Sequence, residues 1–589
     1  RLGVQPLMND WVLPGSSMYT LDSGGHNWWS VCASGAGIGA LALLDDEPQA
    51  RDWVRAADRS LVEFFEYRGQ VLRNKPVNFD PAGAFYEGVG YADYALSEYL
   101  LFRLAQLNAL PEPLPEIPVL ERVADFFAHT VYPASDGFLA VNFGDSEIST
   151  SAETTVRLLA VHGFSPELSR WYLRQVGPDP ADPIGLLYFD DSAPARQSLP
   201  HSIIYPDIGW AVLRDSWDRD ATLLAVKSGD TWNHAHADAG SFILFHAGRP
   251  LLIDAGSCSY GRPEYRGYYA RSTAHNVVLF NGEGQPEEDF HRGAKFPGHL
   301  HELLDGHGVK YLYADSTGPM ARYLTRNYRH WLWVDGVILV FDDLRSHEAG
   351  RFEWLLHYAG EARRTGTDID LTNGPARAWV RMLHPENPVV SEKEGLEEKR
   401  PERKLTYLAL SSPTPVREQR FVVAIVPQPA GGIPAPEVEL VRLPEALGVR
   451  VRSARQITEV YVNLLADGRQ RGCLDSTNTI AGWGTDASLF AVTRPASSEP
   501  MDVGQVTRYF VADGSYLRRD GQVVLHAFSK ISAVIKPGAA AEIQLQGQRH
   551  VEATLLALQA PGTLHVNGQP TSFDHQPAAR TLRFRHRST

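Results

Sequence analysis

The sequence predicts a multidomain α+β protein in which a helical N-terminal third is followed by antiparallel β-sheets. Apolar residues recur at helical spacing over the first third of the chain. Near residue 200 the pattern changes to short runs rich in β-branched and aromatic residues. The chain has 589 residues, 43% apolar and 21% charged. This is long enough for several domains, since one domain usually takes about 100 to 200 residues.

Three stretches carry the helical pattern. Breaker segments at Asp80–Gly83, Pro111–Pro118 and Ser135–Gly137 punctuate them. The pattern therefore predicts helix pairs joined by loops that are long enough to carry function. The apolar positions are Trp53, Ala57, Leu61, Phe64 and Phe65 in the first stretch, Tyr94, Leu101, Leu104 and Ala105 in the second, and Val156, Leu159, Leu168 and Trp171 in the third.

The rest of the chain is predicted to form strands. Asp335-Gly336 lies between the apolar runs Trp331–Val334 and Val337–Val340, which is typical of a tight hairpin turn. Residues 361–405 are charged and rich in turn formers, and Pro427–Pro436 is rich in Pro and Gly, so each is expected to be a long loop or a domain seam. The other predicted strands are Ala221–Lys227, Ser241–Phe245, Pro250–Asp254, Asn276–Phe280, Phe421–Val426, Val449–Val451, Val460–Leu464, Val523–Phe528 and Leu555–Leu558.

Charge and cysteine content exclude some classes of protein. Lys and Arg total 56 against 70 Asp and Glu, a net charge of -14, which argues against a protein that coats nucleic acid. The three cysteines, Cys32, Cys258 and Cys473, are far apart and support neither a disulfide framework nor a thiolate zinc site. No apolar run reaches the length of a membrane span, so none is expected.

The densest polar cluster is NHAHADAG, residues 233–240. On an extended strand His234, His236 and Asp238 would share one face. Asp254 and His275 stand beside neighbouring candidate strands, and two imidazoles with a carboxylate suit Zn²⁺ or a similar ion with water in the fourth position. The same residues would also serve as ordinary hydrogen-bonding groups at strand ends. Spacing alone does not decide between these interpretations.

Several longer motifs of the sequence resemble those of a known protein family. Asn233–Gln285, with NHAHADAGSFILFHAGRPLLIDAGSCSY and YYARSTAHNVVLFNGEGQ, resembles the central β-domain signature of the heparinase II/III-like polysaccharide lyases. Tyr205–Arg214 and Phe352–His357 fit the same signature. In the helical part, His26–Cys32 and Phe85–Tyr91 resemble the two active-site segments of that family, most closely those of heparinase II-like members.

The resemblance implies an (α/α) toroid of helix pairs over residues 1–200, an antiparallel β-sandwich with a metal site over 201–455, and a smaller C-terminal β domain over 456–589. It implies β-elimination on an anionic, uronic-acid-containing polysaccharide, such as heparin, heparan sulfate, chondroitin or hyaluronan, outside the cytoplasm, either in the periplasm or after secretion. Family toroids place many helices before the Asn-Trp segment, which here begins by residue 26. Either an N-terminal portion of the toroid is therefore expected to be absent from this sequence, or the toroid is expected to be shortened or completed elsewhere.

The resemblance also assigns roles to individual residues. Asn27 would stabilise the uronate carboxylate, Tyr91 would protonate the leaving oxygen, and His234 would remove the C5 proton from the opposite face. His26, Tyr86, Glu87 and Arg271 would line the substrate site, and His236, Asp254 and His275 would bind a divalent metal, with Zn²⁺ as the first candidate, in a structural or site-organising role.

Several alternatives stay open. Tyr86 competes with Tyr91 as the reactive phenol, and Asn27 would be an ordinary cap if a helix began near Trp28. An alginate lyase would share the machinery. An inverting glycoside hydrolase would need two acids that flank the bond, for which Asp80, Glu87 and Asp145 are available. A carbohydrate-binding protein without catalysis is the non-enzymatic alternative.

Overall fold

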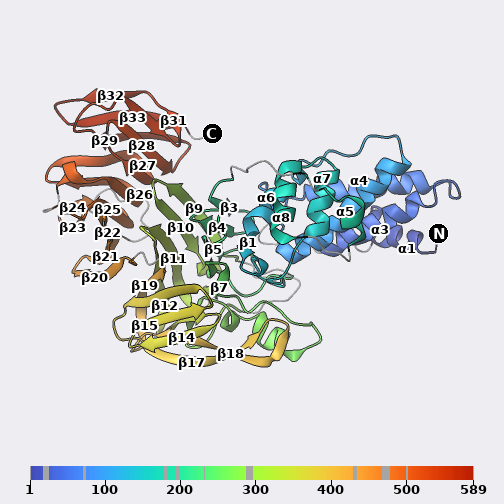
Figure 1. Ribbon diagram of the computed structural model, residues 1–589, viewed down its shortest axis with the longest axis horizontal. Coiled ribbons are helices and arrows are strands. Elements are labelled where there is room, and N and C mark those ends of the chain that lie inside the picture. Colours follow the sequence, from blue (N-terminus) through green and yellow to red (C-terminus); the bar gives the residue numbers. More distant parts are fainter. Residues whose placement is uncertain are drawn as a thin grey trace.

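The computed structural model describes residues 2–16, 21, 25–69, 75–177, 182–190, 192, 199–230, 233–286, 296–428, 434–466, 478–498 and 502–587. Within these ranges the chain is a mixed α+β structure, with helices first and several antiparallel sheets after them. Figure 1 shows the helical part at one end of the long axis and the C-terminal strands on the far side of the molecule. The predicted α+β order is confirmed.

The helical part is built from neighbouring helices, with α3 in contact with both α4 and α5. Helix α4 buries Trp53, Ala57, Leu61 and Phe64 at the predicted helical spacing. The breaker at Ser135–Gly137 forms the turn of a short hairpin, β1 (Val131–Ala134) with β2 (Gly137–Ala140), where only helices were predicted. The closed toroid stays a prediction. The described helices are α1 (Val4–Leu7), η1 (Met8–Val12), α3 (Asn27–Leu41), α4 (Ala50–Phe65), α5 (Val89–Ala109), α6 (Leu120–Thr130), α7 (Glu153–Val161), α8 (Pro166–Val176) and α9 (Pro183–Leu187).

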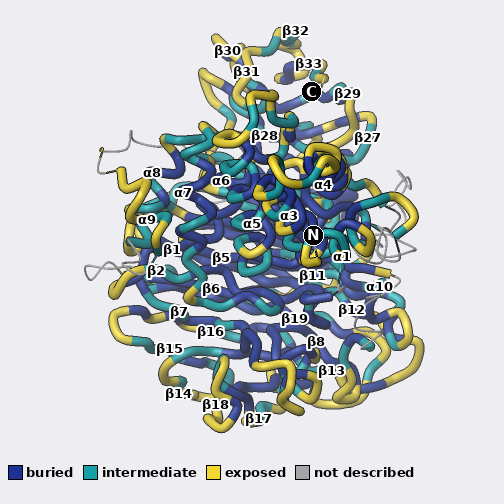
Figure 2. Tube along the Cα trace, turned by 90° about the vertical axis from the view of Figure 1, so that its right-hand side faces the viewer, coloured by how far each residue is buried: buried dark blue, intermediate teal, exposed yellow. Residues whose placement is uncertain are grey.

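A five-stranded sheet joins the helical part to the rest of the molecule. Its strands run in sequence order, β3 (Ser202–Tyr205), β4 (Trp210–Arg214), β5 (Thr222–Lys227), β6 (Ser241–His246) and β7 (Arg249–Leu252). One face packs into the core of the helices and the other into the core of the next sheets. Because side chains alternate between faces and both faces are covered, β5 and β6 are buried along their whole length. Figure 2 shows this buried middle layer.

Two further sheets complete the central part. An eight-stranded sheet has the order β14-β15-β16-β19-β12-β11-β10-β9, and a four-stranded sheet has the order β17-β18-β13-β8. The predicted Asp335-Gly336 turn joins β11 to β12, and both of its residues have positive φ, 53° and 79°. The bounds are β8 (Val278–Phe280), β9 (His299–Gly306), β10 (Val309–Asp315), β11 (Leu324–Val334), β12 (Val337–Gly350), β13 (Phe352–His357), β14 (Glu361–Thr365), β15 (Asp368–Asn373), β16 (Ala376–His384), β17 (Val389–Glu397), β18 (Arg400–Ser411) and β19 (Val416–Pro427).

The expectation of a loop or seam over residues 361–405 is wrong, because β14 to β17 and the start of β18 occupy it. The edge strands β14 and β17 are at least partly exposed along most of their length and carry charged residues, whereas β15 and β16 alternate buried apolar residues with more exposed ones. Edge strands commonly carry such charges, and the charges hide the alternation on which the strand prediction relied. Residues 429–433 of the predicted Pro/Gly-rich seam lie outside the described ranges.

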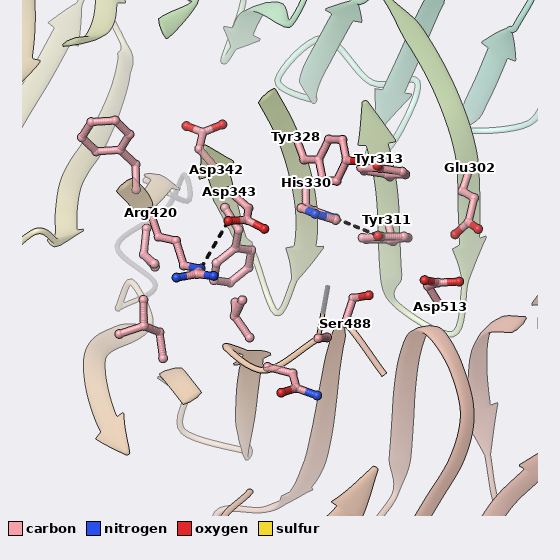
Figure 3. A pocket seen from close by; sticks show the side chains of 17 residues that line it. Glu302, Tyr311, Tyr313, Tyr328, His330, Asp342, Asp343, Arg420, Ser488 and Asp513 are labelled. Atoms are coloured by element: carbon pink, nitrogen blue, oxygen red, sulfur yellow. Dashed lines mark hydrogen bonds and ion pairs between the residues drawn. The ribbon is translucent and has the colours of Figure 1, made fainter. Parts of the chain in front are cut away.

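A fourteen-stranded sheet forms the C-terminal part and begins at Glu437. It packs on the eight-stranded sheet through a shared apolar core. At the edge of this contact lies a pocket in which Tyr311 and His330 are hydrogen bonded (Figure 3). Its strands are β20 (Glu437–Leu443), β21 (Ala446–Arg452), β22 (Gln456–Asn463), β23 (Asn478–Ile480), β24 (Trp483–Thr485), β25 (Leu489–Pro495), β26 (Arg508–Arg519), β27 (Gln522–Lys536), β28 (Ala540–Gln546), β29 (His550–Leu556), β30 (Thr563–Val566), β31 (Gln569–Pro570), β32 (Phe573–Gln576) and β33 (Thr581–Arg587).

The sequence predicts neither a membrane-spanning segment nor a disulfide framework. Among the described helices none is both long and apolar enough to cross a membrane. Cys32 and Cys258 are unpaired thiols, whereas Cys473 lies outside the described residues.

Candidate functional site

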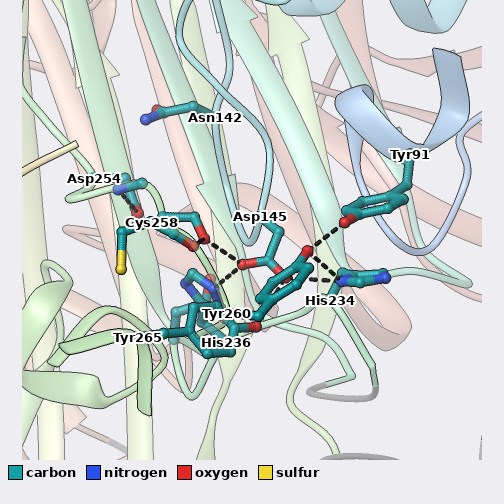
Figure 4. A network of polar contacts seen from close by, with 12 residues as sticks. Tyr91, Asn142, Asp145, His234, His236, Asp254, Cys258, Tyr260 and Tyr265 are labelled. Atoms are coloured by element: carbon teal, nitrogen blue, oxygen red, sulfur yellow. Dashed lines mark hydrogen bonds and ion pairs between the residues drawn. The ribbon is translucent and has the colours of Figure 1, made fainter. Parts of the chain in front are cut away.

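Most of the predicted site residues gather where the helical part meets the loops of the five-stranded sheet. They come from the start of α3, the segment that leads into α5, the loop after β2, the β5–β6 connection and the segment after β7. Figure 4 shows the polar network around Asp145, which links Tyr91 of α5, the β5–β6 connection and the segment after β7.

Glu87 is the centre of the first group of contacts. Its carboxylate is 1% exposed. It accepts hydrogen bonds from Asn27 Nδ2 at 2.7 Å, the Tyr86 hydroxyl at 2.5 Å and Asn233 Nδ2 at 2.8 Å. The predicted residues Asn27, Tyr86 and Glu87 are therefore brought together, and Glu87 is held as a buried acceptor.

The start of α3 shows which residue caps this helix. The helix begins at Asn27, and its N-cap is His26, whose Nδ1 accepts from the Trp28 backbone N–H at 3.3 Å. Asn27 is thus not the capping side chain, and its amide group points to Glu87 instead. Because His26 Nδ1 accepts a hydrogen bond, the neutral imidazole carries its proton on Nε2, which makes that atom a donor.

Tyr91 and His234 form the second group. Their rings are stacked with centroids 3.6 Å apart and planes 7° from parallel. The Tyr91 hydroxyl is hydrogen bonded to that of Tyr260, which also lies 3.1 Å from His234 Nδ1. Burial raises the pKa of Tyr91 to about 12, although the bond with Tyr260 lowers it. Tyr91 therefore keeps its proton at neutral pH and has a partly exposed ring beside the imidazole.

The carboxylate of Asp145 joins the two histidines of the NHAH motif. Oδ2 lies 2.8 Å from His234 Nδ1, and Oδ1 lies 2.9 Å from His236 Nε2. Tyr265 donates to Oδ2 at 2.8 Å and Ser257 donates to Oδ1 at 2.7 Å. Burial alone would raise the pKa of Asp145, but the hydrogen bonds from the two histidines hold it well below its ordinary range. Asp145 is therefore an ionised carboxylate that accepts hydrogen bonds at both of its oxygens.

His236, Asp254 and His275 form the predicted metal cluster. One candidate ligand atom from each lies within 4.8 Å of the others, and all three residues are buried. His236 Nδ1 and His275 Nε2 are buried ring nitrogens without a hydrogen-bond partner, whereas His275 Nδ1 is 2.7 Å from Asp254 Oδ2. Burial alone would raise the pKa of Asp254, but His275 lowers it. Two orphaned imidazole nitrogens beside an ionised carboxylate fit a divalent metal.

One further expectation changes, and Arg271 stays a prediction. Residues 233–240 form turns between β5 and β6 and not a strand, because Asn233 has a positive φ of 54° and Gly240 one of 88°. Asp238 therefore does not share a face with the histidines and instead pairs with the buried Lys227 at 2.6 Å. Arg271, predicted to line the substrate site, is exposed and directly precedes the η3 turn (Ser272–Ala274).

Sequence reasoning missed the central place of Asp145, Tyr260 and Tyr265. Asp145 was considered only as a possible hydrolase acid, and the two tyrosines were not singled out. Their contacts with one another and with the histidines span 26 to 120 residues of sequence, so no local spacing reveals them. The available signal was Gly144, directly before Asp145, whose φ of 70° brings the loop against His234.

Comparisons with known proteins fit this arrangement. Residues 198–423 match the family model described as heparinase II/III-like, C-terminal. A heparin-sulfate lyase from Bacteroides stercoris is 36% identical over 81 residues, 13% of this chain and 12% of that protein. An alginate lyase from Stenotrophomonas maltophilia (strain K279a) is 23% identical over 393 residues, 59% of this chain and 49% of that protein.

Solved structures show the same fold. The crystal structure of heparinase III superposes with a TM-score of 0.59 at 16% identity and covers 72% of this chain and 66% of that one. The matched region spans 12% of the length of the heparin-sulfate lyase and 49% of the length of the alginate lyase. Residues 198–423 thus match the heparinase II/III-like C-terminal model, and the resemblance to the heparinase II/III-like polysaccharide lyases is confirmed.

Proposed function

We propose that this chain is a polysaccharide lyase that cleaves uronic-acid-containing polysaccharides by β-elimination, with glycosaminoglycans such as heparan sulfate as the leading substrate class. The observation that carries the proposal is the stacked pair of Tyr91 and His234 beside the metal cluster. It places a protonated phenol and an imidazole in one site.

His234 is the base in this reaction. Its Nδ1 faces the Asp145 carboxylate at 2.8 Å, so Nε2 has the lone pair that takes the C5 proton. The electron pair left at C5 forms the C4–C5 double bond and expels the glycosidic oxygen from C4. Tyr91, with a pKa raised to about 12 by burial, gives its proton to that oxygen. Since the two rings are stacked, acid and base lie side by side, and action from opposite faces of the sugar stays a prediction.

Charge that develops on the uronate carboxylate needs hydrogen-bond donors. His26 has its Nε2 proton for this purpose, because Nδ1 accepts from the Trp28 N–H. Asn27 is buried and donates to Glu87, so its second amide hydrogen is the one proposed to reach the substrate. Tyr86, Glu87 and Arg271 are proposed to shape the substrate site.

The metal is proposed to organise the site. His236 Nδ1, His275 Nε2 and Asp254 would hold it, with Zn²⁺ the first candidate for this donor set. When bound, the ion would link the β5–β6 connection, which holds His236, to Asp254 in the segment after β7 and to His275 directly after η3. The protein's own residues perform both proton transfers.

A hydrolase finds less support in the geometry. Asp80 accepts backbone N–H groups of Ala82 and Asp207, and Glu87 and Asp145 each accept several side-chain donors. A general acid needs a proton to give, and the hydrogen bonds from His234 and His236 hold the pKa of Asp145 well below its ordinary range, although burial alone would raise it. An alginate lyase is the second candidate, since the relative of that name aligns over 59% of the chain. A binding protein without catalysis is the third.

Absorbance during incubation with heparin, heparan sulfate, chondroitin, hyaluronan and alginate tests the proposal, because elimination leaves a conjugated unsaturated uronate that hydrolysis cannot make. A rise with any polymer supports a lyase and identifies its substrate class. New reducing ends without absorbance would indicate a hydrolase, and binding without cleavage would indicate the third candidate.

Tyr91→Phe and Tyr86→Phe form a matched pair for the reactive phenol. Loss of a general acid costs about 10² to 10⁴-fold in turnover, so Tyr91→Phe is expected to fall by that amount. Tyr86→Phe removes the hydroxyl that donates to Glu87 and is expected to keep most of the activity. The reverse ranking would assign the role to Tyr86.

We also propose the predicted three-domain division, near residues 200 and 455, and action on polymers outside the cytoplasm. The fourteen-stranded sheet that begins at Glu437 supports a separate C-terminal unit.

A further inference from the structure

Asp145 is a carboxylate shared by the catalytic and the metal-binding halves of the site. Its side chain is 1% exposed, and its two oxygens face His234 Nδ1 and His236 Nε2. Figure 4 shows it between the two imidazoles, with the ring of Tyr91 lying over that of His234. It belongs to the loop after β2, whereas both histidines belong to the β5–β6 connection.

The chemistry of these contacts fixes both imidazole tautomers. An ionised carboxylate can only accept hydrogen bonds, so the facing nitrogen of each neutral imidazole must carry the proton. His234 is then protonated on Nδ1, with its lone pair on Nε2. His236 is protonated on Nε2, with its lone pair on Nδ1, the buried atom without a hydrogen-bond partner in the cluster. One carboxylate thus sets opposite tautomers on two histidines.

The loop is built to hold the carboxylate there. The Asp145 N–H donates to the His234 carbonyl at 3.0 Å. At Gly144 an added Cβ would lie 2.5 Å from that same carbonyl oxygen. The hydroxyls of Ser257, Tyr260 and Tyr265 also donate to the carboxylate. Backbone and side-chain contacts therefore fix its distance to both rings.

We propose that Asp145 is a positioning residue that holds His234 ready to take the substrate proton and His236 ready to bind the metal, and so couples metal binding to the orientation of the base. The coupling to catalysis rests on the proposed lyase function. The effect on metal binding does not, because it follows from the contact with His236 alone.

Asp145→Asn is the sharpest test, since the amide has the same shape but offers one acceptor oxygen and one donor NH₂. It can satisfy only one of the two imidazole N–H groups. Loss of a partner that orients a metal ligand typically weakens metal affinity by about 10- to 100-fold, and a wrong imidazole tautomer costs a base about 10²-fold or more in kcat. We expect both losses, with KM changed by less than about threefold, since Asp145 is not placed against the substrate.

The matched control is Asp125→Asn, the same chemical change on α6, where Asp125 pairs with Arg122. It should leave kcat and metal affinity as in the unmodified protein. Zn²⁺ affinity is measured by competition with a chromogenic chelator, which needs no substrate, and kcat and KM by the absorbance assay.

The outcomes separate the two proposals. If the unmodified protein cleaves no polymer, the lyase proposal fails, and weaker Zn²⁺ binding by Asp145→Asn still supports the coupling to the metal site. If Asp145→Asn keeps both kcat and affinity within threefold, the inference is overturned. Full recovery of its kcat at saturating Zn²⁺ would overturn the link to His234. Should this variant not fold, Asp145→Glu keeps the charge but displaces it by one methylene. It is expected to lose at least tenfold in kcat, and an unchanged kcat would overturn the inference.

Discussion

Glu398 is predicted to make the stability of the site loop depend on pH near neutrality. It lies in the turn between β17 and β18, and its carboxylate reaches the loop that carries Asp145. There Oε1 accepts from Asn142 Nδ2 at 3.1 Å and from the Ile148 N–H at 3.3 Å. Burial raises the pKa of Glu398 from 4.5 to about 7, although these two hydrogen bonds lower it.

The direction of the effect follows from this raised pKa. The folded state holds a proton on Glu398 that the unfolded chain has lost, so the contribution to stability is complete below pH 4.5 and is lost as the pH rises through about 7. A pKa raised from 4.5 to about 7 corresponds to at most ~3 kcal/mol in the free energy of unfolding. Since the side chain is partly exposed, solvent screening reduces this to ~1–2 kcal/mol.

Glu398→Gln removes the charge and keeps an acceptor oxygen for both partners. At pH 8 the variant is expected to be ~1–2 kcal/mol more stable than the unmodified protein, and below pH 5 the two should be alike. Urea unfolding between pH 5 and 8.5 measures this, followed by a signal from the helical part. Glu394→Gln is the control, because it makes the same chemical change away from the site loop, at an exposed residue of β17 that pairs with Lys404. If the Glu398→Gln variant were less stable at pH 8 than the unmodified protein, the reasoning would be refuted.

Three further predictions concern the site and its supports. Gly144→Ala combines a φ of 70° with a Cβ 2.5 Å from the His234 carbonyl, so it should cost at least ~2 kcal/mol in unfolding free energy; Gly163→Ala, at φ 83° with open space around it, should cost only ~1 kcal/mol, and equal losses would contradict the close-approach argument. Zn²⁺ at a hundred times its Kd should stabilise the protein by ~2.7 kcal/mol in thermal melting, and His236→Ala should abolish this gain; identical melting with chelator and with Zn²⁺ would count against the metal site. Arg214→Lys should cost ~2–4 kcal/mol, because the buried guanidinium donates to two backbone carbonyls at 2.6 Å; an unchanged urea midpoint would show that these bonds are dispensable.

Local patterns predicted the parts of the fold that local physics determines. The amphipathic spacing around Trp53 gave α4, and Asp335-Gly336 gave the β11–β12 turn. Strand runs buried on both faces, as in β5, were evident from composition alone. The edge strands β14 and β17 were missed because charged residues on both faces mask their alternation. The alternation of β15 and β16 was overlooked because these strands lie within a segment that is charged overall.

The site was predictable where a motif holds neighbouring residues, as with His234 and His236. The grouping of His236 with Asp254 and His275 required the family resemblance, since spacing alone left it open. The role of Asp145 could not be predicted from the sequence because it depends on contacts with residues 89 to 120 positions away. The residues that neighbour an Asp in a loop do not show whether its carboxylate accepts hydrogen bonds from two buried histidines or is simply exposed on the surface.

Asp145 contacts residues that are far away in the sequence, and this separation affects when the site forms during folding. Contacts between distant segments form only after the entropy of closing long loops has been overcome, so they tend to appear late in folding. A chain whose helical part has already folded has the carboxylate but neither imidazole. We therefore expect activity to appear after most secondary structure during refolding, and to disappear before it during unfolding.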